Sequence, residues 1–175
     1  MLASACLPLL FQAVEIDGEA YWDGGYAGNP SLLPLISETA ADDLLLVQIN
    51  PSRREAVPTQ ASDILDRASE VTFNASLLKE LRTIGLIKEL LEDAGRPDSC
   101  FRRPLFKRVD DLRLHQLDAG DQLARLGAAS KTQTNWSFLS QLHAIGRQAA
   151  DGWLAQHRRD VGRRSTVALP PSLTP

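Results

Sequence analysis

The sequence predicts a mixed α/β fold, and three stretches of the chain support this prediction. Residues 42–51, "DDLLLVQINP", contain five consecutive apolar or near-apolar positions, Leu44–Gln48, followed by Ile49, which is typical of a strand buried on both faces of an α/β sheet. From about residue 59, apolar residues recur at spacings of three, four and seven, which indicates helix. Residues 111–118 alternate leucine with polar residues, which indicates a further strand. A chain of 175 residues is long enough for one domain of ordinary size.

The first element in chain order is a predicted β-hairpin. In "AVEIDGEAYWDGG" strand-like residues flank Asp17-Gly18, and Asp-Gly is a favoured two-residue hairpin turn. Residues 1–14 before it are largely apolar, and we expect them to belong to the core. No basic segment precedes this apolar run, which argues against a signal peptide.

The helical pattern that follows is long. Ser62 is the expected N-cap, and Gly95 with the following Arg96-Pro97 is the expected stop. Because the run is unusually long, we expect a break near Phe73-Asn74 or at Gly85.

A second helix is expected over residues 135–157. Its apolar residues, including Trp136 and Trp153, fall on one face. The proline-rich end, residues 165–175, predicts a flexible tail.

Charge is distributed unevenly along the chain, whose formal net charge is −3. Seven acidic residues and no lysine or arginine precede Arg53, whereas the remainder carries 19 basic and 15 acidic residues. This asymmetry predicts two differently built regions.

Cysteine and histidine usage predicts no metal site, and we expect no cofactor. Cys6 and Cys100 are far apart and form no Cys-x-x-Cys motif, which favours a reduced, cytoplasmic chain. His115, His143 and His157 show no spacing typical of metal ligands, and we expect each to be structural or solvent-facing.

Two basic clusters occupy residues 102–108, "RRPLFKR", and 157–164, "HRRDVGRR". They contain few aromatic residues, so we do not expect nucleic acid as a partner. Contact with anionic lipid headgroups is one interpretation, and favourable arginine charges at the end of a helix are the other.

The most distinctive stretch is residues 20–30, "AYWDGGYAGNP". Glycine tolerates positive φ and brings no side chain, so a strand that ends in Asp23-Gly24-Gly25 can turn sharply and leave its carboxylate beside an open pocket. Such a carboxylate could serve as the base for a serine. The alternative is a plain turn, as we interpret Asp17-Gly18.

The wider stretch, residues 2–37, resembles the end of the catalytic domain of the patatin-like phospholipases. In that family a segment Ala-Ser-x-x-x-Pro leads through a hairpin to Asp-Gly-Gly or Asp-Gly-Ala, and then to Asn-Pro. The matching residues are Ala3, Ser4, Pro8, Asp23, Gly24, Gly25, Asn29 and Pro30. The rest of the chain, with "LLLVQINP", "TFNASLLKELR" and "DVGRRSTV", resembles the C-terminal extension of a bacterial branch of the family.

This resemblance implies an α/β/α sandwich of three layers and a Ser-Asp dyad that hydrolyses acyl esters of lipids. Asp23 would be the dyad aspartate, activating the serine without a histidine between them. Gly24, Gly25, Asn29 and Pro30 would support the motif. The implied partner is a lipid or other acyl-ester substrate, together with peripheral contact at a membrane.

The sequence departs from the family pattern at the nucleophile. It contains no Gly-x-Ser-x-Gly and no glycine-rich loop that would bind the oxyanion, and both precede the aspartate in the family. We therefore expect the C-terminal portion of a longer hydrolase, inactive alone because the dyad works as a unit.

The expected division of the chain follows from that resemblance. Residues 1–50 would end the incomplete catalytic domain, 51–164 would form a mainly helical extension, and 165–175 would be the tail. The alternative is a non-catalytic interaction or regulatory module that docks on a separate catalytic half.

Overall fold

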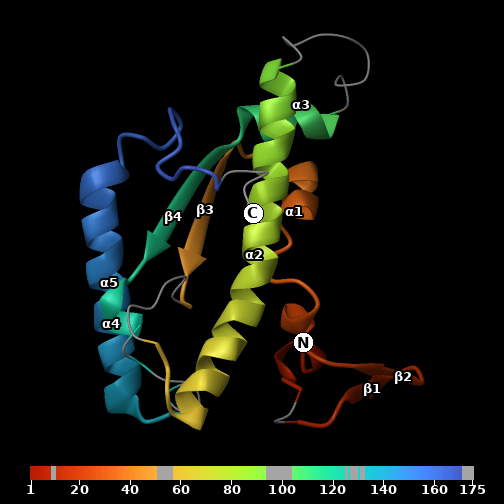
Figure 1. The fold of residues 1–175 in the computed structure, drawn as a ribbon, viewed down its shortest axis with the longest axis vertical. Helices are drawn as coiled ribbons and strands as arrows, with labels where there is room; N and C mark the ends of the chain where they lie inside the picture. Colours follow the sequence, from red (N-terminus) through yellow and green to blue (C-terminus); the bar gives the residue numbers. More distant parts are fainter. Residues whose placement is uncertain are drawn as a thin grey trace.

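The structure, a computed structural model, describes residues 1–8, 11–50, 57–93, 104–124, 126, 130 and 133–170. It is a mixed α/β protein with an antiparallel hairpin, a parallel pair of strands and several helices (Figure 1). The predicted fold class is therefore confirmed.

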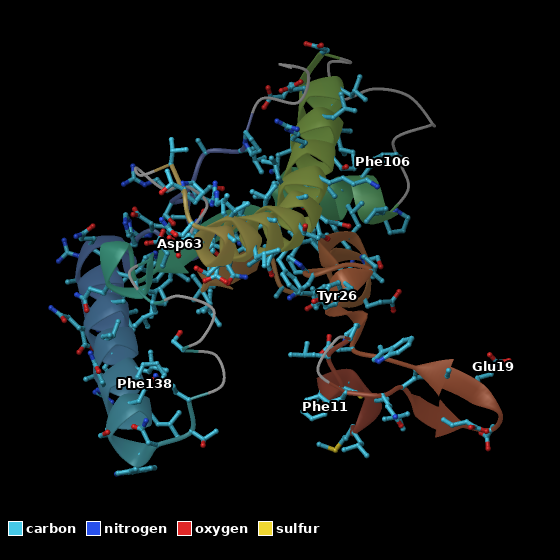
Figure 2. The ribbon with its side chains drawn as sticks, turned by 60° about the horizontal axis from the view of Figure 1, so that its bottom comes forward. Phe11, Glu19, Tyr26, Asp63, Phe106 and Phe138 are labelled. Atoms are coloured by element: carbon cyan, nitrogen blue, oxygen red, sulfur yellow. The ribbon has the colours of Figure 1, made fainter. Side chains whose placement is uncertain are left out.

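The predicted hairpin is confirmed. Strand β1 (Val14–Ile16) pairs antiparallel with β2 (Glu19–Tyr21), and Ile16 lies opposite Glu19. Asp17 and Gly18, which connect the strands, have φ angles of 55° and 83°. Positive φ at both positions gives the turn a twist that matches the strands. The hairpin projects from the rest of the molecule (Figures 1 and 2).

The second sheet joins two strands that are distant in sequence. Strand β3 (Asp43–Gln48) pairs parallel with β4 (Arg113–Asp118), from Asp43 opposite Arg113 to Gln48 opposite Asp118. Parallel strands need a crossover connection, and here it contains α2 (Ala61–Asp93) and α3 (Pro104–Asp111). Both predicted strands are present. Because β3 pairs with β4, the expected division at residue 50 separates two halves of one sheet.

Helices lie on both faces of this sheet (Figure 1). On one face α1 (Leu32–Glu38), α2 and α3 enclose the main core with the two strands. The core consists of Leu32, Ile36, Leu46, Ile84, Val109, Leu112 and Leu114. On the other face α5 (Trp136–His157) contacts β4. There the ring centroids of Trp153 and His115 lie 5.8 Å apart.

Strand β3 is buried on one face only, so the prediction of two buried faces is wrong. Leu46 is 8% exposed, whereas Leu45 and Val47, which point to the opposite face, are 46% and 64% exposed. The physical reason is that α5 packs against β4 and leaves these β3 side chains uncovered.

The expectation that residues 1–14 belong to the core is also wrong. Cys6 is buried, but Met1, Leu2 and Phe11 are exposed. The short helix η1 (Ala3–Ala5) has no buried residue. This segment contacts the loop around Asp23, whose N–H donates to the Cys6 carbonyl.

Helix α2 is continuous through both places where we expected a break. Gly85 is accommodated because it lies under the C-terminal segment: a Cβ atom there would lie 3.5 Å from the Pro170 carbonyl oxygen and 3.7 Å from Leu169 Cβ. The helix also begins at Ala61, before the expected cap Ser62. The expected stop at residues 95–97 lies outside the described residues.

The helix predicted over residues 135–157 is confirmed, with Asn135 as its N-cap. The Asn135 side chain accepts a hydrogen bond from the Phe138 N–H at 2.8 Å. The short helix α4 (Asp121–Ala124) precedes it.

The C-terminal segment differs from the flexible tail that the sequence led us to expect. Thr166 N–H donates to the Leu114 carbonyl at 3.0 Å, and Leu114 N–H donates to Ser165 Oγ at 3.0 Å. Val167 and Leu169 pack against the core. Residues 165–170 are therefore attached to the free edge of β4, whereas 171–175 lie outside the described residues.

Candidate active-site segment

Asp23 lies where the chain leaves the hairpin and enters the short helix η2 (Gly24–Tyr26). Its Oδ1 accepts a hydrogen bond from Gly25 N–H at 2.7 Å, so the carboxylate caps this helix. Its backbone N–H donates to the Cys6 carbonyl at 2.8 Å. The structure thus brings the Ala3–Pro8 segment and the Asp-Gly-Gly turn together, and it leaves Asp23 half-buried.

Of the two uses of glycine that the sequence suggested, the structure supports the lack of a side chain, and it does so at Gly25. Neither Gly24 nor Gly25 has positive φ. A Cβ atom at Gly25 would lie 3.0 Å from Asp23 Oδ1 and 3.5 Å from Phe73 Cε1, whereas one at Gly24 would meet nothing within 4 Å. Gly25 therefore provides room for the carboxylate and for Phe73.

Asn29 and Pro30 follow η2 and lead into α1. The Asn29 N–H donates to Ser76 Oγ at 3.1 Å, and the Asn29–Pro30 peptide bond is cis. A few residues later, Leu33 N–H donates to Glu80 Oε2 at 3.1 Å. The backbone of the predicted motif is thus held by side chains of α2.

Sequence reasoning missed the face of α2 that makes these contacts. Phe73, Ser76 and Glu80 follow one another at i, i+3 and i+7, which places them on one side of the helix. The centroids of the Phe73 and Tyr26 rings lie 5.1 Å apart, and the ring planes form an angle of 62°. The helical spacing of these residues is visible in "TFNASLLKELR", but the spacing alone did not indicate which part of the chain this face contacts.

A second aspartate, Asp43, has many more partners and was not among the predicted site residues. Arg113 donates to Asp43 Oδ2 from Nε at 3.1 Å and from Nη2 at 3.0 Å. His115 Nε2 lies 2.9 Å from Oδ1, and Gly162 N–H donates to Oδ1 at 2.8 Å. The hydrogen bonds from Arg113 hold the pKa of Asp43 well below its usual range, and those from His115 and Gly162 act in the same direction against partial burial.

His115 links this cluster to the C-terminal segment. It is 1% exposed, and its Nδ1 lies 3.2 Å from Thr166 Oγ1. Asp43, Arg113, His115 and Thr166 therefore tie β3, β4 and the C-terminal segment together. This placement matches the structural role that we expected for His115.

The basic cluster at residues 157–164 contains an internal ion pair. Asp160 Oδ1 accepts from Arg164 Nε at 2.7 Å, and Asp160 Oδ2 lies 3.2 Å from His157 Nδ1. The hydrogen bond from Arg164, followed by that from His157, lowers the pKa of Asp160. These contacts follow the end of α5. Of the other basic cluster, residues 102–108, residues 102 and 103 lie outside the described residues.

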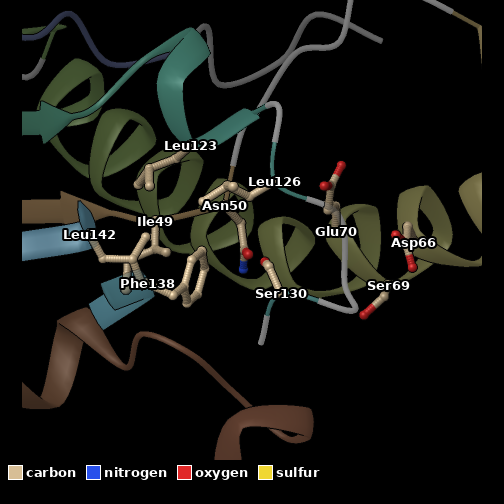
Figure 3. Close-up of a pocket in the computed structure, with 10 residues that line it drawn as sticks. All are labelled: Ile49, Asn50, Asp66, Ser69, Glu70, Leu123, Leu126, Ser130, Phe138 and Leu142. Carbon is tan, nitrogen blue, oxygen red and sulfur yellow. The ribbon is translucent and has the colours of Figure 1, made fainter. Parts of the chain in front are cut away.

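A hollow of about 140 Å³ lies between α2, the end of β3 and α5 (Figure 3). One side is apolar, with Ile49, Phe138 and Leu142, and the other carries polar residues of α2. Among these, Glu70 is 6% exposed and lies 3.2 Å from Arg67 Nη1. A buried carboxylate needs such a partner, so the pair accounts for the charge at this position.

The described residues contain no group of three or more His, Cys, Asp or Glu side chains that could hold a metal ion. None of the helices in the described ranges combines the length and apolar character needed to cross a membrane.

The segment that contains the Asp23 turn also matches a known family. Residues 1–36 match the patatin-like phospholipase family. The match includes Asp23, Gly24, Gly25, Asn29 and Pro30, and residues 37–175 lie outside it. No curated protein and no solved structure matches the chain. The family resemblance therefore concerns the hairpin, η2 and the start of α1, the segment that α2 contacts.

Proposed function

We propose that this chain contributes Asp23 as the dyad aspartate of a patatin-like hydrolase that cleaves acyl esters of lipids. The observation that carries the proposal is the match of residues 1–36, because it includes the turn that caps η2 with the Asp23 carboxylate. In this proposal the nucleophilic serine and the oxyanion donors lie outside the 175 residues, since the sequence has no Gly-x-Ser-x-Gly.

The geometry suggests how the carboxylate would act. Gly25 N–H binds Asp23 Oδ1, so we assign Oδ2 to the serine hydroxyl. As the serine oxygen attacks the ester carbonyl, its proton passes to the carboxylate, which gives it to the departing alkoxide, so the alcohol leaves as the acyl-enzyme forms. Water then attacks the acyl-enzyme and gives a proton to the same carboxylate, which returns it to the serine oxygen as the fatty acid is released.

Ser4 is not a candidate nucleophile in this scheme. Its hydroxyl donates to the Met1 carbonyl at 2.8 Å on the exposed side of η1. A nucleophilic serine instead occupies a tight strand-to-helix turn that presents its oxygen to substrate.

The proposal is tested with the DNA that precedes the Met1 codon. We expect it to encode a segment with Gly-x-Ser-x-Gly, which is expressed together with this chain and assayed with p-nitrophenyl esters. Asp23→Asn should abolish hydrolysis. Asp17→Asn is the matched control, since it also precedes glycine and lies in the exposed hairpin turn. Activity that survives Asp23→Asn, or an assembled protein without ester hydrolysis, would overturn the proposal.

A second candidate function is a non-catalytic module that docks on a separate catalytic half. It is favoured by the apolar side chains that β3 exposes, Leu45 and Val47, and by Ile49 just beyond the strand. No other strand of the described residues pairs with the second edge of β3. An exposed apolar strand edge is a ready site for another polypeptide.

This candidate predicts binding without catalysis by this chain. Val47→Lys should abolish co-purification with the upstream segment, whereas Val161→Lys, at a position that is 45% exposed, should not. Co-purification that Val47→Lys leaves unchanged would exclude docking at β3. Asp23→Asn separates the two candidates, because it should abolish hydrolysis if this chain supplies the dyad aspartate and should leave hydrolysis unchanged if the chain only docks.

A further inference from the structure

Helix α2 carries apolar residues on two faces over residues 64–78. One face packs against the core, with Leu77 among its members. The other face is turned to solvent, where Ile64, Val71 and Leu78 are 49%, 52% and 39% exposed. A helix at the surface of a protein needs only one apolar face, the one that packs on the core. The second face therefore calls for a cover that the described residues do not supply.

The exposed face follows a regular pattern. Its members, which we call the α2 stripe, are all exposed: Ile64, Ala68, Val71, Ala75 and Leu78. They follow one another at spacings of four, three, four and three residues, and this alternation is the pattern of the seam between two helices of a coiled coil. Large residues alternate with alanines along the stripe. The large side chains of a second helix can therefore enter the space that the alanines leave.

The α2 stripe is complementary to itself when two copies run antiparallel. A two-fold axis between Val71 and Ala75 places Val71 of each copy opposite Ala75 of the other. The same axis places Leu78 of one copy opposite Ala68 of the other. Each of these layers combines one large residue with one alanine, as close packing requires. A surface that is complementary to itself in this way fits a second copy of the same chain.

The charges at the two ends of the stripe are opposite in sign. Asp63 precedes Ile64, and Arg82 continues the stripe one turn beyond Leu78; both charged side chains are exposed. In the antiparallel pair, Arg82 of one copy lies opposite Ile64 of the other, so its alkyl part can cover the isoleucine while its guanidinium reaches Asp63. In a parallel pair each charge would instead lie level with the same charge of the other copy. Charge complementarity therefore favours the antiparallel pair.

Space for a second helix is present along the stripe. A hollow of about 420 Å³ borders Val71, Ala75 and Leu78, and it is also lined by Val167 and Pro170 of the C-terminal segment. Such a groove between a helix and a second apolar segment is a common binding surface for an amphipathic helix. The groove can therefore receive side chains of the second α2.

We propose that two copies of this chain associate through the α2 stripe, with their α2 helices antiparallel around a two-fold axis between Val71 and Ala75. The interface is independent of the function proposed for Asp23. Phe73, which contacts the Asp23 turn, lies on a different side of the helix from the stripe. The stripe also lies outside residues 1–36, the segment that matches the family.

Sedimentation velocity of the purified chain tests the proposal. Monomer and dimer should be in equilibrium, with more dimer at higher concentration. Val71→Glu should weaken dimerisation at least about tenfold, because it buries a charge in an apolar layer. Leu90→Glu is the matched control, since Leu90 lies on the same helix outside the stripe and is 48% exposed. A chain that stays monomeric, or equal weakening by the two variants, would overturn the inference.

The charged ends provide a second test, which does not depend on the folding of Val71→Glu. Asp63→Arg and Arg82→Asp each place like charges side by side at both ends of the dimer, and each should weaken dimerisation about fivefold. A mixture of these two variants brings opposite charges together again at both ends. The mixture should therefore dimerise more strongly than either variant alone, and less so in high salt. Equal dimerisation of the mixture and the separate variants would contradict the antiparallel arrangement.

Other covers for the stripe would give different results. If a lipid surface covers it, the monomer should float with phosphatidylcholine vesicles and Val71→Glu should not. If the upstream segment covers it, the chain should remain monomeric alone, and Val71→Glu should prevent co-purification with that segment. Either result would overturn the inference. Asp23→Asn should dimerise as the unaltered chain does, so loss of hydrolysis and loss of dimerisation are distinguishable.

Discussion

Asp23 and Asp43 are two aspartates near strand ends, and they are held in opposite ways. The described contacts of the Asp23 carboxylate consist of one hydrogen bond, from a backbone N–H two residues away. Asp43 accepts from Arg113, His115 and Gly162, and it unites segments from three parts of the chain. Asp23, in the family motif, therefore accepts one described hydrogen bond at its carboxylate. Both carboxylate oxygens of Asp43 accept hydrogen bonds from other parts of the fold.

The contrast shows that a perturbed pKa does not by itself identify a reactive group. The hydrogen bonds that lower the pKa of Asp43 also occupy its carboxylate, so both oxygens already have partners. Structural ion-pair networks perturb pKa values as functional sites do. We therefore assign a structural role to Asp43, and the role proposed for Asp23 rests on the family match.

The largest expected effect is the loss of stability in Asp43→Ala. The variant removes the acceptor of Arg113 and leaves the buried His115 without its carboxylate partner, which should lower the free energy of unfolding by about 2–3 kcal/mol. Urea denaturation measures this. The control is Asp42→Ala, because Asp42 lies 3.4 Å from Arg113 Nη2 but is 53% exposed, and it should cost less than about 0.5 kcal/mol. Equal losses would contradict the assignment.

The next effect is a dependence of stability on pH. Because the pKa of Asp43 is lower in the folded chain than its ordinary value of 3.8, its contribution to stability is complete well above that value and declines as pH falls below about 4. The difference in unfolding free energy between the unaltered chain and Asp43→Asn should shrink over this acid range. A difference that stays constant or grows on acidification would show that Asp43 is not the group responsible.

A smaller effect is expected where α2 holds the motif. Ser76→Ala removes the acceptor of the Asn29 N–H, and Phe73→Ala removes the ring against Tyr26 and Gly25. Each should cost about 1 kcal/mol and accelerate amide hydrogen exchange over residues 24–30. Thr72→Ala, on the exposed side of α2, is the control. Unchanged exchange in both variants would mean that η2 keeps its position without the helix.

The smallest stability effect distinguishes the two glycines. Gly25→Ala places a methyl group 3.0 Å from Asp23 Oδ1 and should displace the carboxylate, whereas Gly24→Ala meets nothing within 4 Å. Both should change the unfolding free energy by less than about 1 kcal/mol. Amide chemical shifts over residues 22–27 should move more in Gly25→Ala. Equal shifts would indicate that room at Gly25 does not position Asp23.

Elements with a strong local signal were predictable from the sequence. The hairpin follows from Asp17-Gly18, α5 from its apolar face, and the two longer strands from their apolar patterns. Each signal lies within a few neighbouring residues, where turn geometry and side-chain periodicity act directly.

Features set by distant contacts were not predictable. The exposed face of β3 depends on where α5 packs, and the continuity of α2 at Gly85 depends on the segment that passes over it at Leu169 and Pro170. At the site, the sequence indicated Asp23 and its neighbours. It did not indicate that Phe73 and Ser76, almost fifty residues later, would contact the turn, because periodicity identifies a helix face without naming its partner.

The hydrogen bond from Gly162 to Asp43 joins residues 119 positions apart, and this separation has a consequence for biosynthesis. The ribosome makes Asp43 and β3 long before Gly162 and Thr166 exist. During that interval the nascent chain lacks both the Gly162 donor and the segment that pairs with the outer edge of β4. Contacts of such long range form late, and an unpaired strand edge is prone to aggregation in the meantime. Assembly of this sheet is therefore expected to finish only after Gly162 and Thr166 have been synthesised.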